Sequence, residues 1–367
     1  MHISYSRFRR RTWVGKEFSS PGTVISSGAS AESRNLLLAL GFRFLPEEKQ
    51  IPHFVRNDIP ARLNSFWVGT RICNLQSAIC NPLSRIILSA AILILFASIA
   101  SAYPLTITDG RGGKVTIPRE PKRIVSLTPN CTEILFALGL GDRVAGVTSM
   151  CDYPPAAKKK PKIGDYRTSI EKVVALKPDL IVAHANLNRQ AISTLEKLGK
   201  TIIAFDPKTL AELRRDIVTI GRAANRLSEA EAVAGRISSA LADVRKTTAK
   251  ARSRPKVMVV IQAQPLWVAG PRTFVDEMIR AAHAKNIAWD ARAGFNQFST
   301  EVAVSRDPDV IIVRKGGAKE IIAGPLWKRT SAVRNHRVHE MDMDLLVRPG
   351  PRLAQGIKDL ARVVQNP

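Results

Sequence analysis

Short runs of β-branched and other apolar residues alternate with amphipathic segments along the chain after residue 102. Runs of this kind are typical of buried strands, whereas the segments between them have the 3.6-residue period of helices. We expect strands over residues 123–127, 143–147, 180–183, 201–205, 256–261, 309–313 and 337–341. Because strands and helices alternate, the pattern predicts an α/β fold with mostly parallel strands.

Helix start signals and prolines place the helices between these strands. The expected helices cover residues 130–138, 169–176, 191–198, 210–224, 228–251, 273–282 and 352–364. Capping boxes are expected at Asn130 with Glu133, Thr168 with Glu171 and Ser228 with Glu231. The helix over 228–251 has no internal proline and would be about 36 Å long.

This long helix divides the chain into two α/β lobes. We expect a first lobe over 103–222, a bridging helix with its flanks over 223–254, and a second lobe over 255–367. An internal repeat supports this division, since EKVVALKPDLIV in the first lobe matches EVAVSRDPDVIIV in the second. In both copies a glutamate at a helix start precedes Pro-Asp and an apolar strand, which indicates duplicated architecture.

A hydrophobic segment before the first lobe indicates export. Residues 86–96 (IILSAAILILF) carry no charge, follow Arg85 and are followed by small residues. A positive flank, a short apolar core and small residues predict a signal peptide over 85–102, cleaved after Ala102. The alternative is an uncleaved membrane anchor, for which the apolar stretch is at the short limit. No cysteine stands at the expected cleavage point, so a lipid-anchored protein is not expected.

The segment before the signal peptide does not have the pattern of a fold. Residues 1–84 show no sustained period of 2 or 3.6, so we interpret them as a non-structural or mis-called extension. Translation would then start at a codon read here as Val68, Leu75 or Leu83.

The net charge of the chain is interpreted differently once residues 1–102 are set aside. The full sequence has 56 Lys+Arg, 31 Asp+Glu and a net charge of +25, of which the first 102 residues carry 7 units. After residue 102 the only dense basic cluster is KKKPK at 158–162, and no nucleic-acid module is present. We therefore expect no nucleic-acid partner and a solvated basic surface, with a residual indication of an anionic ligand or membrane face.

No enzymatic motif accompanies this pattern. GxxxxGK[ST], HExxH and GxSxG are all absent from the sequence. Gly139 and Gly141 follow a helix rather than a strand, so they are expected to end that helix. His336 and His339 lack further ligands at metal-site spacing, so no metal site and no catalytic residue are expected.

Two cysteines follow strands of the first lobe. Cys131 and Cys151 both fall where loops of an open α/β sheet carry function. An oxidising compartment permits a disulfide between them, and two free thiols are an equal alternative.

Several motifs together resemble one family. RIVSLTPNCTEILFALGLGDRVAGVTSMCDYPP, KPKIGDY, TSIEKVVALKPDLIVA and STEVAVSRDPDVIIV resemble the periplasmic substrate-binding proteins of ABC importers for vitamin B12 and ferric siderophores. The resemblance covers residues 121–364. It implies two Rossmann-like α/β lobes joined by one long bridging helix, with the ligand in a cleft between the lobes. It also implies a monomer without a cofactor, whose partner is the permease in the inner membrane.

The resemblance assigns two kinds of site residue. Glu171 and Glu301 match the glutamates by which cobalamin-binding members dock to arginines of the permease, although each also suits a helix dipole. Tyr153 matches a ligand-contacting tyrosine of the family, and Tyr166 and Phe295 stand at positions of ligand-contacting aromatics. Asn130, Trp267 and Arg348 are further ligand-binding candidates, chosen by their position in loops.

The expected function is therefore a periplasmic solute-binding component that captures cobalamin or a related corrinoid. A ferric siderophore or haem is the alternative ligand, with Tyr153 as an iron ligand in the case of haem. Tyr166 and Phe295 depart from the cobalamin pattern, and Arg348 with the basic chain favours an anionic chelate. An alternative of another class is a ligand-sensing ectodomain, tethered by an uncleaved segment over 86–102.

Overall fold

The computed structural model describes residues 103–165 and 167–366. The expected N-terminal extension, the signal peptide and Tyr166 lie outside the described residues. In the described part of the chain no helix combines the length and the apolar character needed to cross a membrane.

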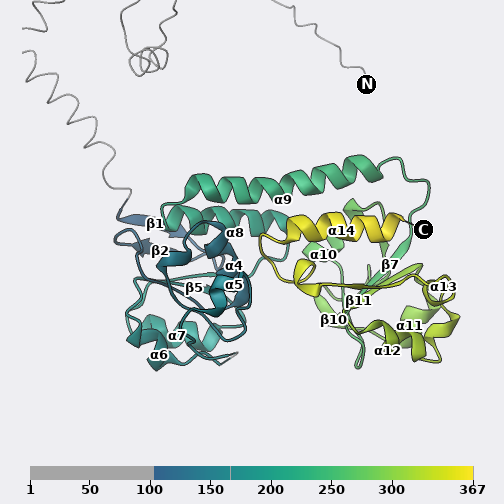
Figure 1. Ribbon diagram of the computed structural model, residues 1–367, viewed down its shortest axis with the longest axis horizontal. Helices are drawn as coiled ribbons and strands as arrows, with labels where there is room; N and C mark the ends of the chain where they lie inside the picture. Colours follow the sequence, from purple (N-terminus) through teal and green to yellow (C-terminus); the bar gives the residue numbers. More distant parts are fainter. Residues whose placement is uncertain (1–102, 166, 367) are drawn as a thin grey trace, which may run out of the picture. The chain divides into compact units, whose positions relative to one another are not determined.

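The first lobe, drawn in blue and teal in Figure 1, contains a four-stranded sheet whose strands are parallel, as the sequence pattern predicts. Its strand order is β4-β3-β5-β6. Its strands are β3 (Ile124–Ser126), β4 (Val144–Gly146), β5 (Leu180–His184) and β6 (Ile202–Phe205). Its helices are α4 (Pro129–Ala137), α5 (Pro155–Lys158), α6 (Ile170–Ala175), α7 (Arg189–Lys197) and α8 (Leu210–Ala223), with a 3₁₀ turn η2 (Gly141–Arg143). An antiparallel hairpin that the sequence analysis did not predict precedes the sheet, formed by β1 (Leu105–Thr108) and β2 (Lys114–Ile117).

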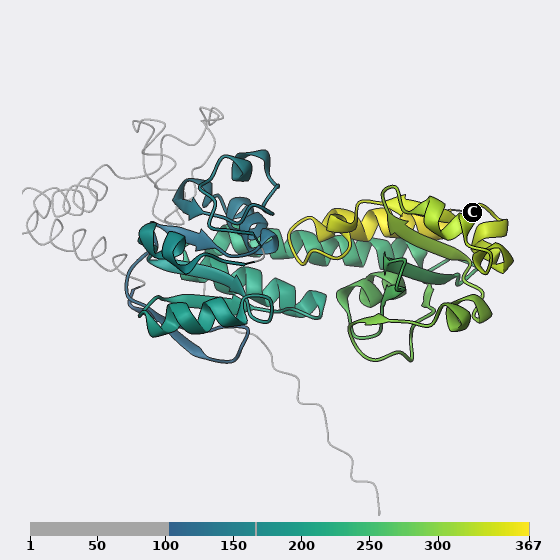
Figure 2. The same ribbon diagram turned by 90° about the horizontal axis from the view of Figure 1, so that it is seen from below.

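The second lobe, drawn in green and yellow in Figure 2, contains a mixed sheet. Its strand order is β10-β8-β7-β11-β12, and β9 also pairs with β7. Its strands are β7 (Lys256–Gln262), β8 (Trp267–Ala269), β9 (Lys285–Asn286), β10 (Phe295–Gln297), β11 (Val310–Arg314) and β12 (Val338–Met341). The pairs of β7, β11 and β12 are parallel, whereas β8 and β10 are antiparallel additions. The helical elements are α10 (Phe274–Ala281), α11 (Thr300–Ser305), α12 (Ala318–Ala323), η3 (Trp327–Arg329), α13 (Ser331–Arg334), η4 (Met343–Leu345) and α14 (Leu353–Gln365).

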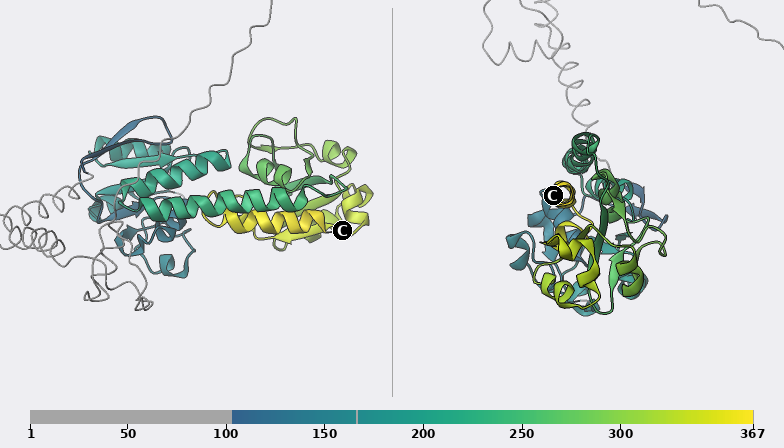
Figure 3. Two further views of the ribbon diagram at one scale, coloured as in Figure 1. Left: turned by 90° about the horizontal axis from the view of Figure 1, so that it is seen from above. Right: turned by 90° about the vertical axis from the view of Figure 1, so that its right-hand side faces the viewer.

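One long helix packs against helices of both lobes. Helix α9 (Leu227–Thr248) has 22 residues and is therefore about 33 Å long. It contacts α8 of the first lobe and α10 and α14 of the second, and runs beside α14 (Figure 3). The expected capping box at Ser228 is wrong, because the helix begins at Leu227 without a side-chain cap.

Period-2 alternation of apolar side chains gives each sheet two buried faces. In β7, Val257 and Val259 belong to one core cluster, while Met258 and Val260 belong to another. The same division holds in β5, β11 and their neighbours. The cluster that contains Val257 also includes residues of α8, α9, α10 and α14. Successive strand side chains point to opposite faces, so each sheet presents one of its two apolar faces to this cluster. Both lobes therefore share one continuous apolar core along α9.

Two helix starts differ from the sequence prediction. The N-cap of α4 is Thr128 rather than Asn130, and it accepts no hydrogen bond with its side chain. The N-cap of α6 is Ser169 rather than Thr168, and its hydroxyl accepts the backbone N–H of Lys172. The position of Glu133 is therefore not explained by a capping box.

The internal repeat of the sequence is a repeated local structure. Ser169 caps α6 and Ser299 caps α11, each by accepting the backbone N–H three residues on. After each helix, an aspartate carboxylate accepts a backbone N–H at the start of the neighbouring strand. Asp179 accepts from Arg123 at 2.9 Å and Asp309 from Lys256 at 2.7 Å. These bonds fix the position of each short helix against its sheet.

Candidate ligand-binding and docking sites

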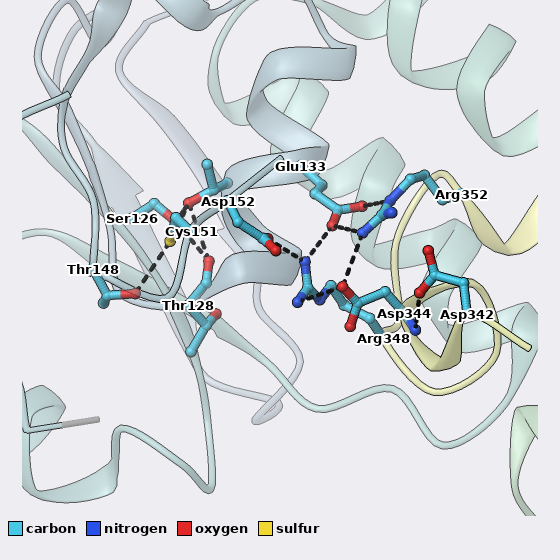
Figure 4. Close-up of polar contacts among 11 residues, drawn as sticks. Ser126, Thr128, Glu133, Thr148, Cys151, Asp152, Asp342, Asp344, Arg348 and Arg352 are labelled. Atoms are coloured by element: carbon cyan, nitrogen blue, oxygen red, sulfur yellow. Dashed lines mark hydrogen bonds and ion pairs between the residues drawn. The ribbon is translucent and has the colours of Figure 1, made fainter. Parts of the chain in front are cut away.

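A buried glutamate of the first lobe holds two arginines of the second. Glu133 lies on α4, and only 2% of its side chain is exposed. Arg352 donates to it from Nε at 2.9 Å and from Nη2 at 2.6 Å, and Arg348 donates from Nη1 at 2.9 Å (Figure 4). Charge-assisted bonds with this fork geometry are among the strongest in proteins. The contact therefore links the two lobes at one point.

Two further carboxylates complete this cluster. Asp152 follows β4 and accepts from Arg348 Nη1 at 2.9 Å, while Asp344 in η4 lies 2.8 Å from Arg348 Nη2. We call Glu133, Asp152, Asp344, Arg348 and Arg352 the interlobe cluster. Its three carboxylates outnumber its two guanidinium groups, so it has no cation without an acidic partner.

The cluster shifts the ionisation of its carboxyl groups in opposite directions. Burial opposes the ionisation of Asp152, but the Arg348 hydrogen bond and charge outweigh it and lower the pKa of that carboxyl. At Asp344 burial is the larger effect, so its pKa is raised despite the charges of Arg348 and Arg352. The hydrogen bond with Glu133 raises the pKa of Arg352. Both arginines therefore stay charged and held in place.

This geometry changes the interpretation of Arg348. The sequence analysis took it as a cation that favours an anionic chelate. In the structure its guanidinium contacts three carboxylates. An anionic ligand at this position would have to displace an acidic side chain, because like charges repel at such distances. Arg348 thus gives no support for an anionic ligand.

Tyr153 lies directly against the interlobe cluster. Its ring is 4.3 Å from the guanidinium carbon of Arg352, at stacking distance for a cation–π contact. The side chain is nevertheless 44% exposed, so one part of the ring faces solvent. A tyrosine oriented by an arginine and open on another side suits contact with a flat ligand.

Buried hydroxyls and thiols position the loop that carries Asp152 and Tyr153. The Sγ of Cys151 lies 3.1 Å from the hydroxyls of both Thr132 and Thr148 (Figure 4). The structure corrects the disulfide alternative, since Cys131 and Cys151 are both free and buried thiols. Burial raises the pKa of Cys131 to about 12, so it remains a protonated apolar group.

The other ligand-binding candidates fall in two places. Asn130 is buried on α4, with 7% exposure. Trp267 and Phe295 lie on the antiparallel strands β8 and β10, where Trp267 pairs with Gln297 and Phe295 with Ala269. Because directly opposed residues share a face, both rings lie on one side of this ribbon. Trp267 is 38% and Phe295 37% exposed.

The structure joins only some of these candidates by direct contacts. Tyr153 and Arg348 meet in and around the interlobe cluster. Among the described residues, no hydrogen bond, ion pair or ring contact joins Trp267 or Phe295 to that cluster. Phe295 instead packs edge-on against Phe274, with ring centroids 6.0 Å apart. A single cleft lined by all of them stays a prediction.

The sequence analysis missed the residues that organise the interlobe cluster. Glu133 had a signal, but it was interpreted as part of a capping box. Arg352 is separated from Glu133 by 219 positions along the chain. No local pattern indicates a pair so far apart, because sequence periodicity reports only on neighbours within one element.

The two docking candidates have matching surroundings. Glu171 and Glu301 are exposed in the first turns of α6 and α11. The hydroxyl of Ser169 donates to Glu171 at 2.9 Å, and that of Ser299 donates to Glu301 at 2.7 Å. A hydrogen bond from its own backbone N–H, together with Ser169, lowers the pKa of Glu171, and Ser299 does the same at Glu301. Both carboxylates are therefore ionised and preoriented.

Comparisons with known proteins point in one direction. The family model described as "Periplasmic binding protein" matches residues 124–345. The ABC transporter substrate-binding lipoprotein YvrC of Bacillus subtilis (strain 168) is 37% identical over 270 residues, which cover 71% of this chain and 86% of that protein.

Two solved structures are similar over nearly their whole length. The periplasmic heme-binding protein RhuT of Roseiflexus sp. RS-1, in apo form, is 31% identical with a TM-score of 0.61, over 66% of this chain and 98% of that one. The periplasmic vitamin B12 binding protein BtuF of Vibrio cholerae is 28% identical with a TM-score of 0.60, over 67% and 98%. All three relatives are named as binding proteins, and YvrC is named as one of an ABC transporter.

Proposed function

We propose the function of this chain from the premise that it belongs to the periplasmic binding protein family, whose members deliver solutes to ABC transporters. The solute is cobalamin or a related corrinoid, carried as a transported ligand and not as a cofactor. Haem or a ferric siderophore is the second candidate, favoured by the similarity to RhuT and by the exposed phenol of Tyr153.

The corrinoid assignment is carried by one observation: exposed aromatic side chains occur together with an interlobe cluster in which every cation has an acidic partner. Tyr153, Trp267 and Phe295 are each more than a third exposed. Aromatic faces bury the area of a large flat ligand. The interlobe cluster beside Tyr153 offers no unpaired cation for an anionic chelate. Similarity to BtuF of Vibrio cholerae supports the same ligand class.

Calorimetric titration of the purified protein tests this assignment. Cyanocobalamin should bind with a stoichiometry of one, and Tyr153→Ala should weaken its binding about tenfold, because one stacked ring is lost. Leu187→Ala is the matched control, because Leu187 is an exposed apolar residue (72%) outside the candidate site. Binding of haem or a ferric tris-catecholate in place of cyanocobalamin would contradict the corrinoid assignment.

The partner is the permease of an ABC importer, which Glu171 and Glu301 approach from the two lobes. We infer a periplasmic monomer, exported by the segment over 85–102 and cleaved after Ala102, with domain boundaries at 103–222, 223–254 and 255–367. Export is supported by YvrC, which is named a substrate-binding lipoprotein, whereas the cleavage site and the monomer rest on the sequence alone. N-terminal sequencing of the exported protein checks the cleavage. A chain retained in the membrane fraction would favour the tethered ectodomain.

A further inference from the structure

A basic pocket lies in the second lobe, beside strand β9. It is a cavity of about 490 Å³ to which four segments of the chain contribute. We call it the Trp289 pocket, and the residues that define it are Arg254, Arg272, Asp276, Arg280, Lys285 and Trp289. None of them belongs to the interlobe cluster or to the two docking helices.

The pocket has an excess of positive charge. Its four cations face one carboxylate, Asp276, which lies 3.2 Å from Arg280. Within residues 103–165 and 167–366, no carboxylate forms an ion pair with Arg254, Arg272 or Lys285. All three are exposed. Three cations around one cavity without acidic partners attract an anion, because the field of like charges adds in a concave site.

The floor of the pocket is rigid. Asn286 is 3% exposed and donates from Nδ2 to the backbone oxygen of Ala269 at 3.0 Å and to Asp276 at 3.1 Å. Its own amide oxygen accepts the backbone N–H of Ala288 at 3.0 Å. These buried bonds tie β8, α10 and β9 together. The cations around the rim are therefore held by a fixed scaffold.

An exposed indole stands at the rim. Trp289 is 56% exposed, and the Nζ of Lys285 lies 5.8 Å from its ring centroid. An indole beside lysine and arginine side chains is suited to a membrane surface, where the ring enters the headgroup layer and the cations meet phosphates. A soluble anion would give no reason for a large exposed aromatic side chain.

The pocket is connected to a docking helix. Arg306, the C-cap of α11, pairs with Asp290 through two contacts of 2.6 and 2.8 Å, and also donates to the backbone oxygen of Ile287. Asp290 is the next residue after Trp289. Arg306 and Glu301 are separated by about 8 Å along the helix axis. Glu301 and the pocket are thus linked through one short helix, and docking to a membrane permease would bring both close to the membrane surface.

We propose that the Trp289 pocket binds the phosphate of an anionic phospholipid headgroup and holds the protein at the membrane surface. The choice of a lipid over a soluble phosphate rests on the proposed docking function. The cations contact the phosphate diester, and Trp289 inserts between headgroups.

Co-sedimentation of the purified protein with vesicles tests the proposal. The vesicles are an equal mixture of phosphatidylglycerol and phosphatidylcholine, compared with pure phosphatidylcholine, in low salt. Arg254→Gln with Lys285→Gln should lower the partition constant for the mixed vesicles roughly 30-fold, as expected for two charges near an anionic surface. Trp289→Ala should lower it about tenfold through lost apolar burial.

The matched control carries the same change of net charge elsewhere. Lys114→Gln with Lys197→Gln alters two exposed lysines of the first lobe outside the basic cluster at 158–162, and it should leave the partition constant within about twofold. Equal losses in the pocket and control variants would overturn the proposal, as would absence of binding to the mixed vesicles. Binding of inorganic phosphate without vesicle binding would overturn the lipid as its source. The vesicles contain no permease, so these failures are distinct from a failure of Glu301 docking.

Discussion

At the scale of single residues, the surroundings of Asp216 disfavour the ionised form of its carboxyl group. It lies on α8 and lines a cavity of about 380 Å³ together with Asp109, Asp206, Glu212 and Arg215. Burial, reinforced by the negative charge of Glu212, raises the pKa of Asp216 to about 7, against an ordinary value of 3.8. The attraction of Arg215 is too weak to offset these two effects. Between these two pKa values the folded protein therefore keeps the carboxyl proton of Asp216, whereas the unfolded chain has released it.

We predict that Asp216→Asn removes a pH-dependent cost. Below about pH 4 both states bind the proton, so the substitution should change the free energy of unfolding little. As the pH rises toward 7, the unfolded state loses its proton first and the wild-type protein loses stability. At pH 8 the variant should be more stable by about 2–4 kcal/mol. Urea unfolding at pH 4 and pH 8 measures both values, and an equal difference at the two pH values would contradict the prediction.

At the scale of elements, contacts between α4 and the start of α14 join the lobes. Glu133 is an almost fully buried carboxylate that accepts three hydrogen bonds from Arg348 and Arg352. Breaking a buried pair leaves charge without a partner, which costs more than the pair contributes when it is intact. The same guanidinium of Arg348 also pairs with Asp152, whose side chain is 54% exposed.

Glu133→Gln should destabilise the protein by about 3 kcal/mol, because two buried guanidinium groups lose their shared counter-charge. Asp152→Asn is the control, which removes a carboxylate from the same arginine at an exposed position and should cost less than about 1 kcal/mol. Urea unfolding of the three proteins gives the comparison. Similar losses for both variants would show that burial of Glu133 does not set the strength of the contact.

The strands that the sequence did not predict are the four-residue strands β1 and β2 of the hairpin and the shorter strands β8, β9 and β10. Strands β3 to β7, β11 and β12 were predicted from their apolar runs. By contrast, β8, β9 and β10 have two or three residues each. A period cannot be recognised in so few positions. These strands are defined by their pairing, since β8 and β9 pair with β7 and β10 pairs with β8. Trp267 and Phe295 were nonetheless named as candidates, although the ribbon that joins them was not predicted.

At the scale of the whole molecule, the two lobes share a core and each carries one of the two proposed docking glutamates. The shared core along α9 joins residues of both lobes, so large separate motions would expose apolar side chains. Glu171 and Glu301 carry identical serine contacts on equivalent helices. Two such carboxylates, one on each lobe, fix the register of a docked surface better than one.

Glu171→Arg combined with Glu301→Arg should reduce ligand uptake at least tenfold in cells that carry the importer, through like-charge repulsion at the permease. Ligand affinity by calorimetry should stay within twofold of the wild type. Glu231→Arg, at an exposed position on α9, is the control and should support normal uptake. Normal uptake by the double variant would contradict the docking role.

The sequence by itself determined the alternation of strands and helices, the long helix and the duplicated helix starts that carry Glu171 and Glu301. Each of these depends on residues close together in the chain, where periodicity and capping are decided. Only the tertiary structure decided the interlobe cluster, the free thiols and the Trp289 pocket. Glu133 meets Arg352 across 219 positions, and the pocket gathers four segments around Asn286. Charge pairing at such separations depends on burial and geometry, which no local pattern specifies.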